Sequence, residues 1–131
     1  MKAMIILFVS DQTRSKQFYH AILSVDALLD VPGMTEFPLS HETSLGLMPE
    51  DNIVTILNEG IPNPKKATGI PRGELYLFVM NPAESLQRLA NQGGKIISQV
   101  GLRSWGDRVG YGLDPDGHLI AFARTPTDVE K

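Results

Sequence analysis

The sequence predicts an α+β protein built from two βαβββ modules, whose strands form a curved mixed sheet, or half-barrel, with the helices on the outside. Three observations indicate this. A strand-like run passes directly into a helix at two joints 70 residues apart, Val9-Ser10-Asp11 and Val79-Met80-Asn81. Three shorter strand-like runs follow each helix, and a proline- and glycine-rich connector separates the two sets. Because each half is too small to bury its own sheet, we expect the halves to pack on one another.

The first module opens with a continuous apolar run over residues 4–10, which is typical of a buried strand. Residues 12–23 place Phe18, Tyr19 and Ile22 on one side of a helix, and Ser10 or Asp11 precedes it as an N-cap. Pro32-Gly33 and the polar residues 40–43 then mark turns. The pattern predicts three strands between these signals, over residues 26–31, 34–39 and 44–48.

Residues 49–73 form the connector. Four prolines and three glycines favour irregular structure here, although residues 51–59 are compatible with a short strand or a helical turn. A connector of this length is unusual in so small a protein.

The second module repeats the first. Residues 74–80 predict a strand, and Asn81-Pro82 is a typical helix start, with Asn as the cap and Pro in the first helical position. Gly93 is expected to end this helix in the left-handed conformation. Three further strands are predicted over residues 95–100, 107–113 and 118–124, the last two joined by a tight turn at Asp114-Pro115-Asp116-Gly117.

We therefore expect one domain over residues 1–131. It consists of a first module over about 3–48, the connector at 49–73, and a second module over about 74–124.

Composition excludes several classes of protein. The net charge of −3 argues against a duplex-binding module, so no nucleic-acid partner is expected. The absence of cysteine excludes disulfide scaffolds, thiolate metal sites and cysteine nucleophiles. The longest apolar run, residues 4–9, is far too short to span a membrane. With no recognisable signal segment, the sequence predicts a cytoplasmic protein with no membrane partner.

The layout resembles the vicinal oxygen chelate superfamily, which contains glyoxalases, bleomycin-resistance proteins and extradiol dioxygenases. Three stretches carry this resemblance, together with the duplicated element order, over about residues 3–124. They are Val9-Ser10-Asp11 with the following Ser15 and Phe18-Tyr19, then Trp105-Gly106-Asp107-Arg108, and finally Asp114-Pro115-Asp116-Gly117-His118.

The resemblance also implies four metal-ligand positions, on the first and fourth strands of each module. They fall on Met4, on the segment Gly46-Leu47-Met48, on Glu74 and on Ala121. Only Glu74 carries a donor that a divalent ion prefers, and one carboxylate does not hold such an ion against water. We therefore expect no metal ion and no cofactor.

Strand alternation predicts the side chains that line a cleft between the modules. The lining is apolar and aromatic with one carboxylate, as in many small-molecule pockets. An alternative interpretation is that these side chains simply close the sheet and leave no cavity. The residues concerned are Met4, Ile6, Phe8, Leu47, Glu74, Tyr76, Phe78, Leu119 and Ala121.

Further ligand contacts are expected from Trp105, Arg103 and Tyr111. Trp105 is suited to stack on a planar ligand, and Arg103 and Arg108 to hold an anionic group, but Trp105 also suits a packing role. Glu74 has two interpretations. It is a ligand contact or general base, or it has an ordinary role, either in an ion pair with Arg72 or Arg103 or as an exposed residue at a strand start. The three histidines show no metal-binding spacing, and we assign them surface or capping roles.

The primary functional hypothesis is a metal-free binding protein, similar to bleomycin-resistance proteins, that holds a small, partly aromatic molecule in an apolar cleft. Phe8, Tyr76 and Trp105 would stack on it, and Glu74 and Arg103 would supply polar contacts. One alternative is a divalent-metal-dependent lyase or dioxygenase of the same superfamily, and another is a non-catalytic assembly partner. The resemblance also implies a homodimer.

Overall fold

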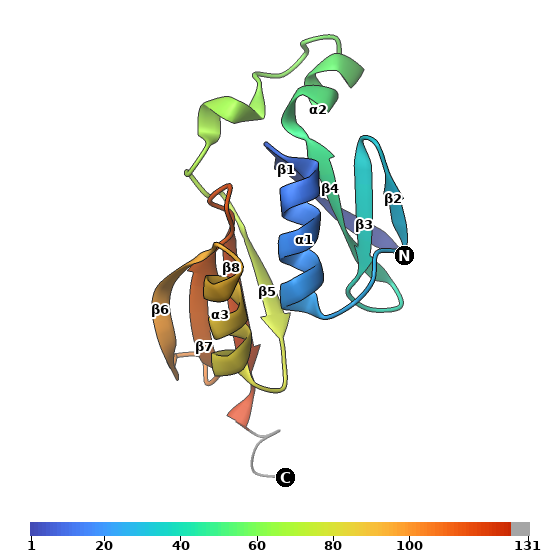
Figure 1. The fold of residues 1–131 in the computed structure, drawn as a ribbon. Coiled ribbons are helices and arrows are strands. Elements are labelled where there is room, and N and C mark those ends of the chain that lie inside the picture. Colours follow the sequence, from blue (N-terminus) through green and yellow to red (C-terminus); the bar gives the residue numbers. More distant parts are fainter. Residues whose placement is uncertain (127–131) are drawn as a thin grey trace. The chain divides into compact units, whose positions relative to one another are not determined.

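The computed structural model describes residues 1–126, which form two compact units. The first unit is Met1–Thr68 and the second begins at Gly69 (Figure 1). The first unit contains the elements β1 (Ala3–Val9), α1 (Gln12–Leu23), β2 (Leu29–Val31), β3 (Met34–Pro38), β4 (Thr43–Pro49), α2 (Glu50–Ile56) and the short 3-10 helix η1 (Pro64–Ala67).

The four strands of the first unit form one mixed sheet in the order β1-β4-β3-β2. β1 runs parallel to β4, and the other two pairs are antiparallel. A parallel pair requires a crossover between its strands, and α1 with β2 and β3 supplies it.

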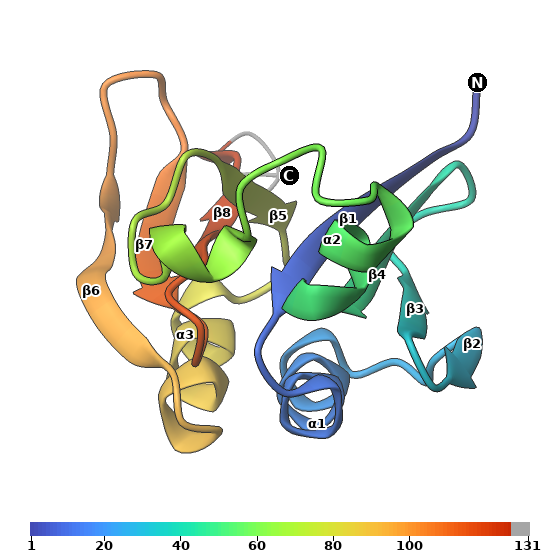
Figure 2. The ribbon, with the colours of Figure 1, turned by 90° about the horizontal axis from the view of Figure 1, so that it is seen from above.

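α1 covers one face of this sheet (Figure 2). The Asp11 side chain accepts a hydrogen bond from the Arg14 amide at 3.0 Å, which caps the helix as the sequence predicts. Phe18, Tyr19 and Ile22 are buried and form the apolar stripe of α1. They share the core of the unit with Phe37, Leu45 and Leu47, all fully buried on β3 and β4.

Polar side chains attach the β2–β3 hairpin to α1. Gln12 donates to the Val31 carbonyl at 2.8 Å and accepts from the Gly33 amide at 2.9 Å. Lys16 bonds Asp30, and the Lys16 and Thr35 hydrogen bonds lower the pKa of that carboxyl. The hairpin is therefore held by the helix as well as by its strand pairing.

The connector is partly helical. Of the two alternatives for residues 51–59, the structure has a helix, α2, with Glu50 and Asp51 in its first turn. Lys65 of η1 bonds the Asp51 side chain at 2.9 Å, and Asn63 bonds it at 3.0 Å. The Lys65 hydrogen bond is the main cause of the lowered pKa of Asp51. Thus the part of the connector that follows α2 folds back onto this helix.

The second unit repeats the architecture. Its sheet has the order β5-β8-β7-β6, with β5 parallel to β8 and the other pairs antiparallel. The elements are β5 (Glu74–Phe78), α3 (Pro82–Asn91), β6 (Lys95–Leu102), β7 (Arg108–Leu113) and β8 (Leu119–Arg124).

α3 begins and ends at the predicted signals. Asn81 caps it by accepting from the Glu84 amide at 3.2 Å, with Pro82 in the first turn, and Gly93 follows it with a φ of +94°. Leu86 and Leu89 are buried against the sheet. A Cβ atom at Gly110 or Gly112 would lie 2.9 or 2.8 Å from these leucines, so the two glycines of β7 allow α3 to pack closely.

These observations confirm the predicted fold class, an α+β protein of two βαβββ modules. Each module forms one mixed sheet with its long helix on one face. That the two modules form a single domain and enclose one cleft stays a prediction. The predicted end of the domain at residue 131 lies outside the described residues.

Candidate functional site

In the second unit, the strand register separates the side chains under α3 from those on the opposite face. Tyr76 pairs with Ala121, which in turn pairs with Tyr111, so these three residues lie on the same face. Both tyrosines pack against a small buried cluster of Val109, Ala121 and Ala123. Glu74, Phe78 and Leu119 follow by alternation on the same strands.

The central feature of this face is a chain of hydrogen bonds through Tyr76. The indole Nε1–H of Trp105 donates to the Tyr76 hydroxyl oxygen at 2.8 Å, and the Tyr76 hydroxyl donates to Oδ2 of Asp107 at 2.6 Å. Phe78 contacts the Tyr76 ring edge-to-face, with centroids 5.3 Å apart. We call Tyr76, Phe78, Trp105, Asp107 and Tyr111 the aromatic face.

Trp105 lies in the turn between β6 and β7. The Arg103 amide donates to the Asp107 carbonyl at 2.9 Å, and the Gly106 amide donates to the Arg103 carbonyl at 3.0 Å. Gly106 has a φ of +102°, which glycine adopts at little cost. The turn therefore presents Trp105 as an exposed side chain, with 58% of its surface accessible.

The hydroxyl of Tyr76 is held in its neutral form. Burial raises the pKa of Tyr76 most, and the hydrogen bond to Asp107 raises it further, because ionisation would place two negative charges side by side. The Trp105 N–H opposes this shift by favouring the phenolate. Tyr76 therefore keeps its O–H and connects Trp105 to Asp107 through hydrogen bonds.

Arg103 is engaged within its own hairpin. Its Nε and Nη2 atoms both bond the Val109 carbonyl, at 3.2 and 2.8 Å, and Nη2 also bonds Ser98 Oγ and the Gln99 carbonyl at 3.0 Å. Its guanidinium carbon lies 5.2 Å from the centre of the Tyr111 ring, a cation–π contact. These contacts give Arg103 a structural role in the hairpin.

Glu74 is exposed at the start of β5. Among residues 1–126 it forms no ion pair, including with Arg72 or Arg103. Its exposure also removes the apolar burial that a general base in this position would need.

The sheet of the first unit has a second face, opposite the one that α1 packs against. Met4 and Ile6 of β1 lie there beside Gly46 of β4, and a Cβ atom at Gly46 would lie 3.0 Å from each of their side chains. Phe8 follows by alternation on the same face. The relation of Phe8 to Tyr76 and Trp105, with which it was predicted to stack, stays a prediction.

The register corrects one predicted lining residue. Leu47 pairs with Leu7 and with Thr35, whereas Ile6 pairs with Gly46. Leu47 is fully buried on the face covered by α1. It therefore does not share a face with Met4, because successive side chains of a strand point to opposite sides, and Gly46 is the residue of the segment Gly46-Leu47-Met48 that lies beside Met4 and Ile6.

Three of the four metal-ligand positions implied by the resemblance lack a donor suited to a divalent ion. Met4 offers only a thioether, Gly46 has no side chain, and Ala121 carries only a methyl group. Glu74 and Ala121 lie on neighbouring strands of one face, and Glu74 is the single carboxylate among these four positions. These residues do not fit the divalent ion of the superfamily.

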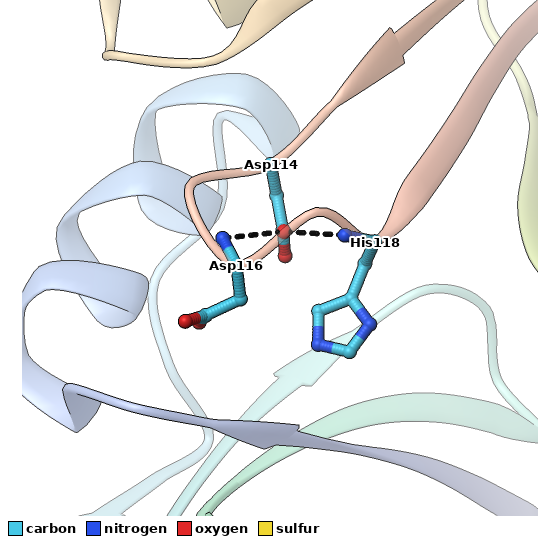
Figure 3. A group of neighbouring side chains, drawn as sticks. All are labelled: Asp114, Asp116 and His118. Atoms are coloured by element: carbon cyan, nitrogen blue, oxygen red, sulfur yellow. Dashed lines mark hydrogen bonds between the residues drawn. The ribbon is translucent and has the colours of Figure 1, made fainter. Parts of the chain in front are cut away.

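Another group of potential ligands lies in the turn between β7 and β8, where ligand atoms of Asp114, Asp116 and His118 are within 4.8 Å of one another (Figure 3). The buried Asp114 uses Oδ1 to accept from the amides of Asp116 and His118, at 2.9 and 2.8 Å. Their convergence is explained by this turn, in which Asp114 is the capping residue.

Sequence reasoning did not select Asp107 as a site residue. Its partner Tyr76 is 31 positions away, and no local pattern connects an aspartate after Trp-Gly to a tyrosine in another strand. One signal was available. Asp107 directly precedes β7 and stands two residues before Val109, so strand alternation places both side chains on the face that carries Tyr76.

The fold and the sheet face define a βαβββ protein of the superfamily that contains glyoxalases and bleomycin-resistance proteins. The family model of the glyoxalase-like domain matches residues 2–125. The chain belongs to this family. No curated protein matches the chain.

Solved structures share the fold over nearly the whole chain. A glyoxalase-related enzyme from Fulvimarina pelagi is 22% identical, with a TM-score of 0.81, covering 96% of this chain and 88% of that one. A glyoxalase/bleomycin resistance protein/dioxygenase family enzyme from Burkholderia phytofirmans PsJN is 11% identical, with a TM-score of 0.80 and coverages of 93% and 96%. A protein of unknown function from Agrobacterium tumefaciens str. C58 is 26% identical, with a TM-score of 0.74 and coverages of 95% and 94%. At these identities the first two establish the fold alone.

Over residues 1–126, no helix has the length and apolar character that crossing a membrane requires.

Proposed function

We propose that this protein binds a small, partly aromatic molecule on the aromatic face of its second unit, without a metal ion. The observation that carries the proposal is the state of Trp105. Its ring is more than half exposed, yet its N–H is fixed to Tyr76. An exposed and oriented indole is suited to stacking on a flat ligand at a small entropic cost.

The surroundings of Trp105 support the same function. Phe78 is 66% exposed, so two large aromatic surfaces meet solvent near one hydroxyl. Single exposed apolar residues are ordinary, but aromatic side chains that cluster with polar groups are typical of binding sites. The lack of suitable metal ligands at Met4 and Ala121 favours binding over metal-dependent lyase or dioxygenase chemistry.

Fluorescence provides a direct test because Trp105 is the only tryptophan. We would titrate the protein with nucleobases, nicotinamide, indole derivatives and flavins. At least one of them is expected to quench Trp105 saturably. Calorimetry should then show that Trp105→Ala weakens binding by about tenfold or more, the effect of losing a stacked aromatic contact.

Leu28→Ala is the matched control, because Leu28 is an exposed apolar side chain of the first unit, 65% accessible. It should leave the affinity unchanged. A complete lack of saturable quenching across the panel, or equal affinity of Trp105→Ala and wild type, would contradict the proposed site.

We further propose that the protein is a homodimer, as its family membership suggests. Light scattering should give twice the chain mass of 14.4 kDa. A mass of one chain at micromolar concentration would contradict this.

A further inference from the structure

We propose that the ligand of the aromatic face is a planar molecule that donates hydrogen bonds and is neutral or cationic, with Asp107 as its acceptor. This inference rests on the proposed function and names the chemical class of its ligand. It follows from the donors and acceptors that the face still has available.

The N–H of Trp105 and the O–H of Tyr76 are already used. An indole has one N–H, and that of Trp105 is given to Tyr76. A tyrosine has one O–H, and that of Tyr76 is given to Asp107. A ligand that needs to accept a hydrogen bond from either group would first have to break the chain.

Acceptors, in contrast, remain available. Oδ2 of Asp107 accepts from Tyr76, but Oδ1 accepts no hydrogen bond from any of residues 1–126. The side chain is half-buried, and no lysine or arginine forms an ion pair with it within that range. A half-buried carboxylate oxygen with lone pairs to spare favours an N–H donor, above all a charged one.

The neighbouring charges agree with this preference. Glu74 lies on the same face, two residues before Tyr76 in β5, and is also a carboxylate. Arg103 holds its guanidinium against Tyr111 and the hairpin carbonyls. Arg108 alternates with Val109 in β7, which places it on the opposite side of the sheet. The face therefore carries the carboxylates of Asp107 and Glu74 against the single guanidinium of Arg103, and carboxylates and aromatic rings both attract cations.

The test compares benzamidine with benzoate. The two molecules have the same flat shape, but benzamidine carries N–H donors and a positive charge, whereas benzoate carries only acceptors and a negative charge. Trp105 quenching should show benzamidine binding at least about tenfold more tightly, as expected for a charge-assisted hydrogen bond.

Asp107→Asn tests the assigned acceptor. The amide keeps an oxygen for the Tyr76 hydroxyl but removes the charge, so benzamidine affinity should fall by about tenfold or more. Asp26→Asn makes the same chemical change at a carboxylate of the first unit that is 97% exposed, and it should bind benzamidine like the wild type. Unfolding curves of both variants confirm that each is folded under the titration conditions.

The outcomes separate the two proposals. Tighter binding of benzoate, or unchanged benzamidine affinity in Asp107→Asn, would overturn the assigned ligand class while leaving a binding function in place. No saturable response to either probe or to the wider metabolite panel would overturn both.

A second measurement checks the premise that Tyr76 holds Trp105. Tyr76→Phe removes the oxygen that accepts the indole N–H, so the fluorescence anisotropy of Trp105 should decay faster than in the wild type or in Asp26→Asn. An unchanged decay would show that the hydrogen bond does not fix the indole, which would overturn the donor count.

Discussion

Tyr76 is the residue on which the candidate site depends. It accepts from Trp105, donates to Asp107 and packs on the buried cluster of Val109, Ala121 and Ala123. The Tyr76 side chain therefore packs against the core of the second unit and also hydrogen-bonds the exposed indole of Trp105. Substitution at this position is expected to affect both stability and ligand binding, whereas substitution of Trp105 affects mainly binding.

The raised pKa of Tyr76 predicts a specific pH dependence. In the unfolded chain tyrosine ionises near pH 10, but in the folded protein burial and then Asp107 keep it protonated to higher pH. The unfolded state thus loses its proton first. The stabilisation is fully present below about pH 10 and is lost as pH rises through the raised pKa.

Chemical denaturation of the wild type and Tyr76→Phe measures this effect. At pH 8 we expect the wild type to be more stable by about 1 kcal/mol, the usual contribution of a hydrogen bond. This advantage should shrink above pH 10. A constant difference from pH 8 to pH 11 would contradict the assigned environment of Tyr76.

At the scale of elements, the second unit uses the same turn twice. Each turn spans five residues, 103–107 between β6 and β7 and 114–118 between β7 and β8. In both, the amide of the first residue donates to the carbonyl of the fifth, and the amide of the fourth residue, a glycine with positive φ, donates to the carbonyl of the first. These glycines are Gly106 and Gly117, and the turns they close carry Trp105 and Asp114. The two turns differ in their surroundings, which permits a matched comparison.

Gly117→Ala should destabilise the protein more than Gly106→Ala. Both glycines have positive φ, at +88° and +102°, where alanine costs about 1 to 2 kcal/mol. A Cβ atom at Gly117 would also lie 2.8 Å from the backbone of Gly69, whereas one at Gly106 meets nothing within 4 Å. Equal losses in the free energy of unfolding would show that the contact with Gly69 is not maintained.

The N-terminus of α3 gives a second test at this scale. Asn81→Ala removes the cap on the Glu84 amide and should lower the free energy of unfolding by about 1 kcal/mol. Gln87→Ala, an exposed change on the same helix, should have an effect within about 0.5 kcal/mol of zero. A similar small effect at Asn81 would contradict the capping role.

At the scale of the whole molecule, the chain has the family fold, but three of the four implied metal-ligand positions carry residues that do not bind a divalent ion. Met4, Gly46 and Ala121 leave Glu74 as the single carboxylate among them. Binding of a divalent ion would require several oxygen or nitrogen donors at one point.

We therefore predict that the purified protein contains far less than one divalent ion per chain, and that a chelator leaves its unfolding temperature unchanged. Elemental analysis and thermal unfolding with and without EDTA measure this. One equivalent of nickel, zinc, manganese or iron, with a loss of stability on chelation, would instead support a metal-dependent activity.

The sequence by itself determined the strands and long helices of the two modules, but not α2 and η1 of the connector, because the signals of the former are local. Asp11 and Asn81 precede helices as caps, Gly93 follows one, and the Asp-Pro-Asp-Gly turn stands where the chain reverses. The duplication of these signals predicted two βαβββ modules. Predicted strand ends were less accurate. His118 was expected in the last strand but lies just before β8, where its amide donates to the Asp114 side chain.

Only the tertiary structure decided which side chains meet. Trp105 and Asp107, in the turn between β6 and β7, are joined by hydrogen bonds to Tyr76 of β5, from which they are 29 and 31 positions away in sequence. The register of β1 and β4 places Leu47 on the buried face, and Arg103 donates hydrogen bonds within the β6–β7 hairpin. The physical reason is that pairing register and hydrogen-bond partners are set by the energy of the assembled sheet, whereas caps and turns are set by neighbouring residues.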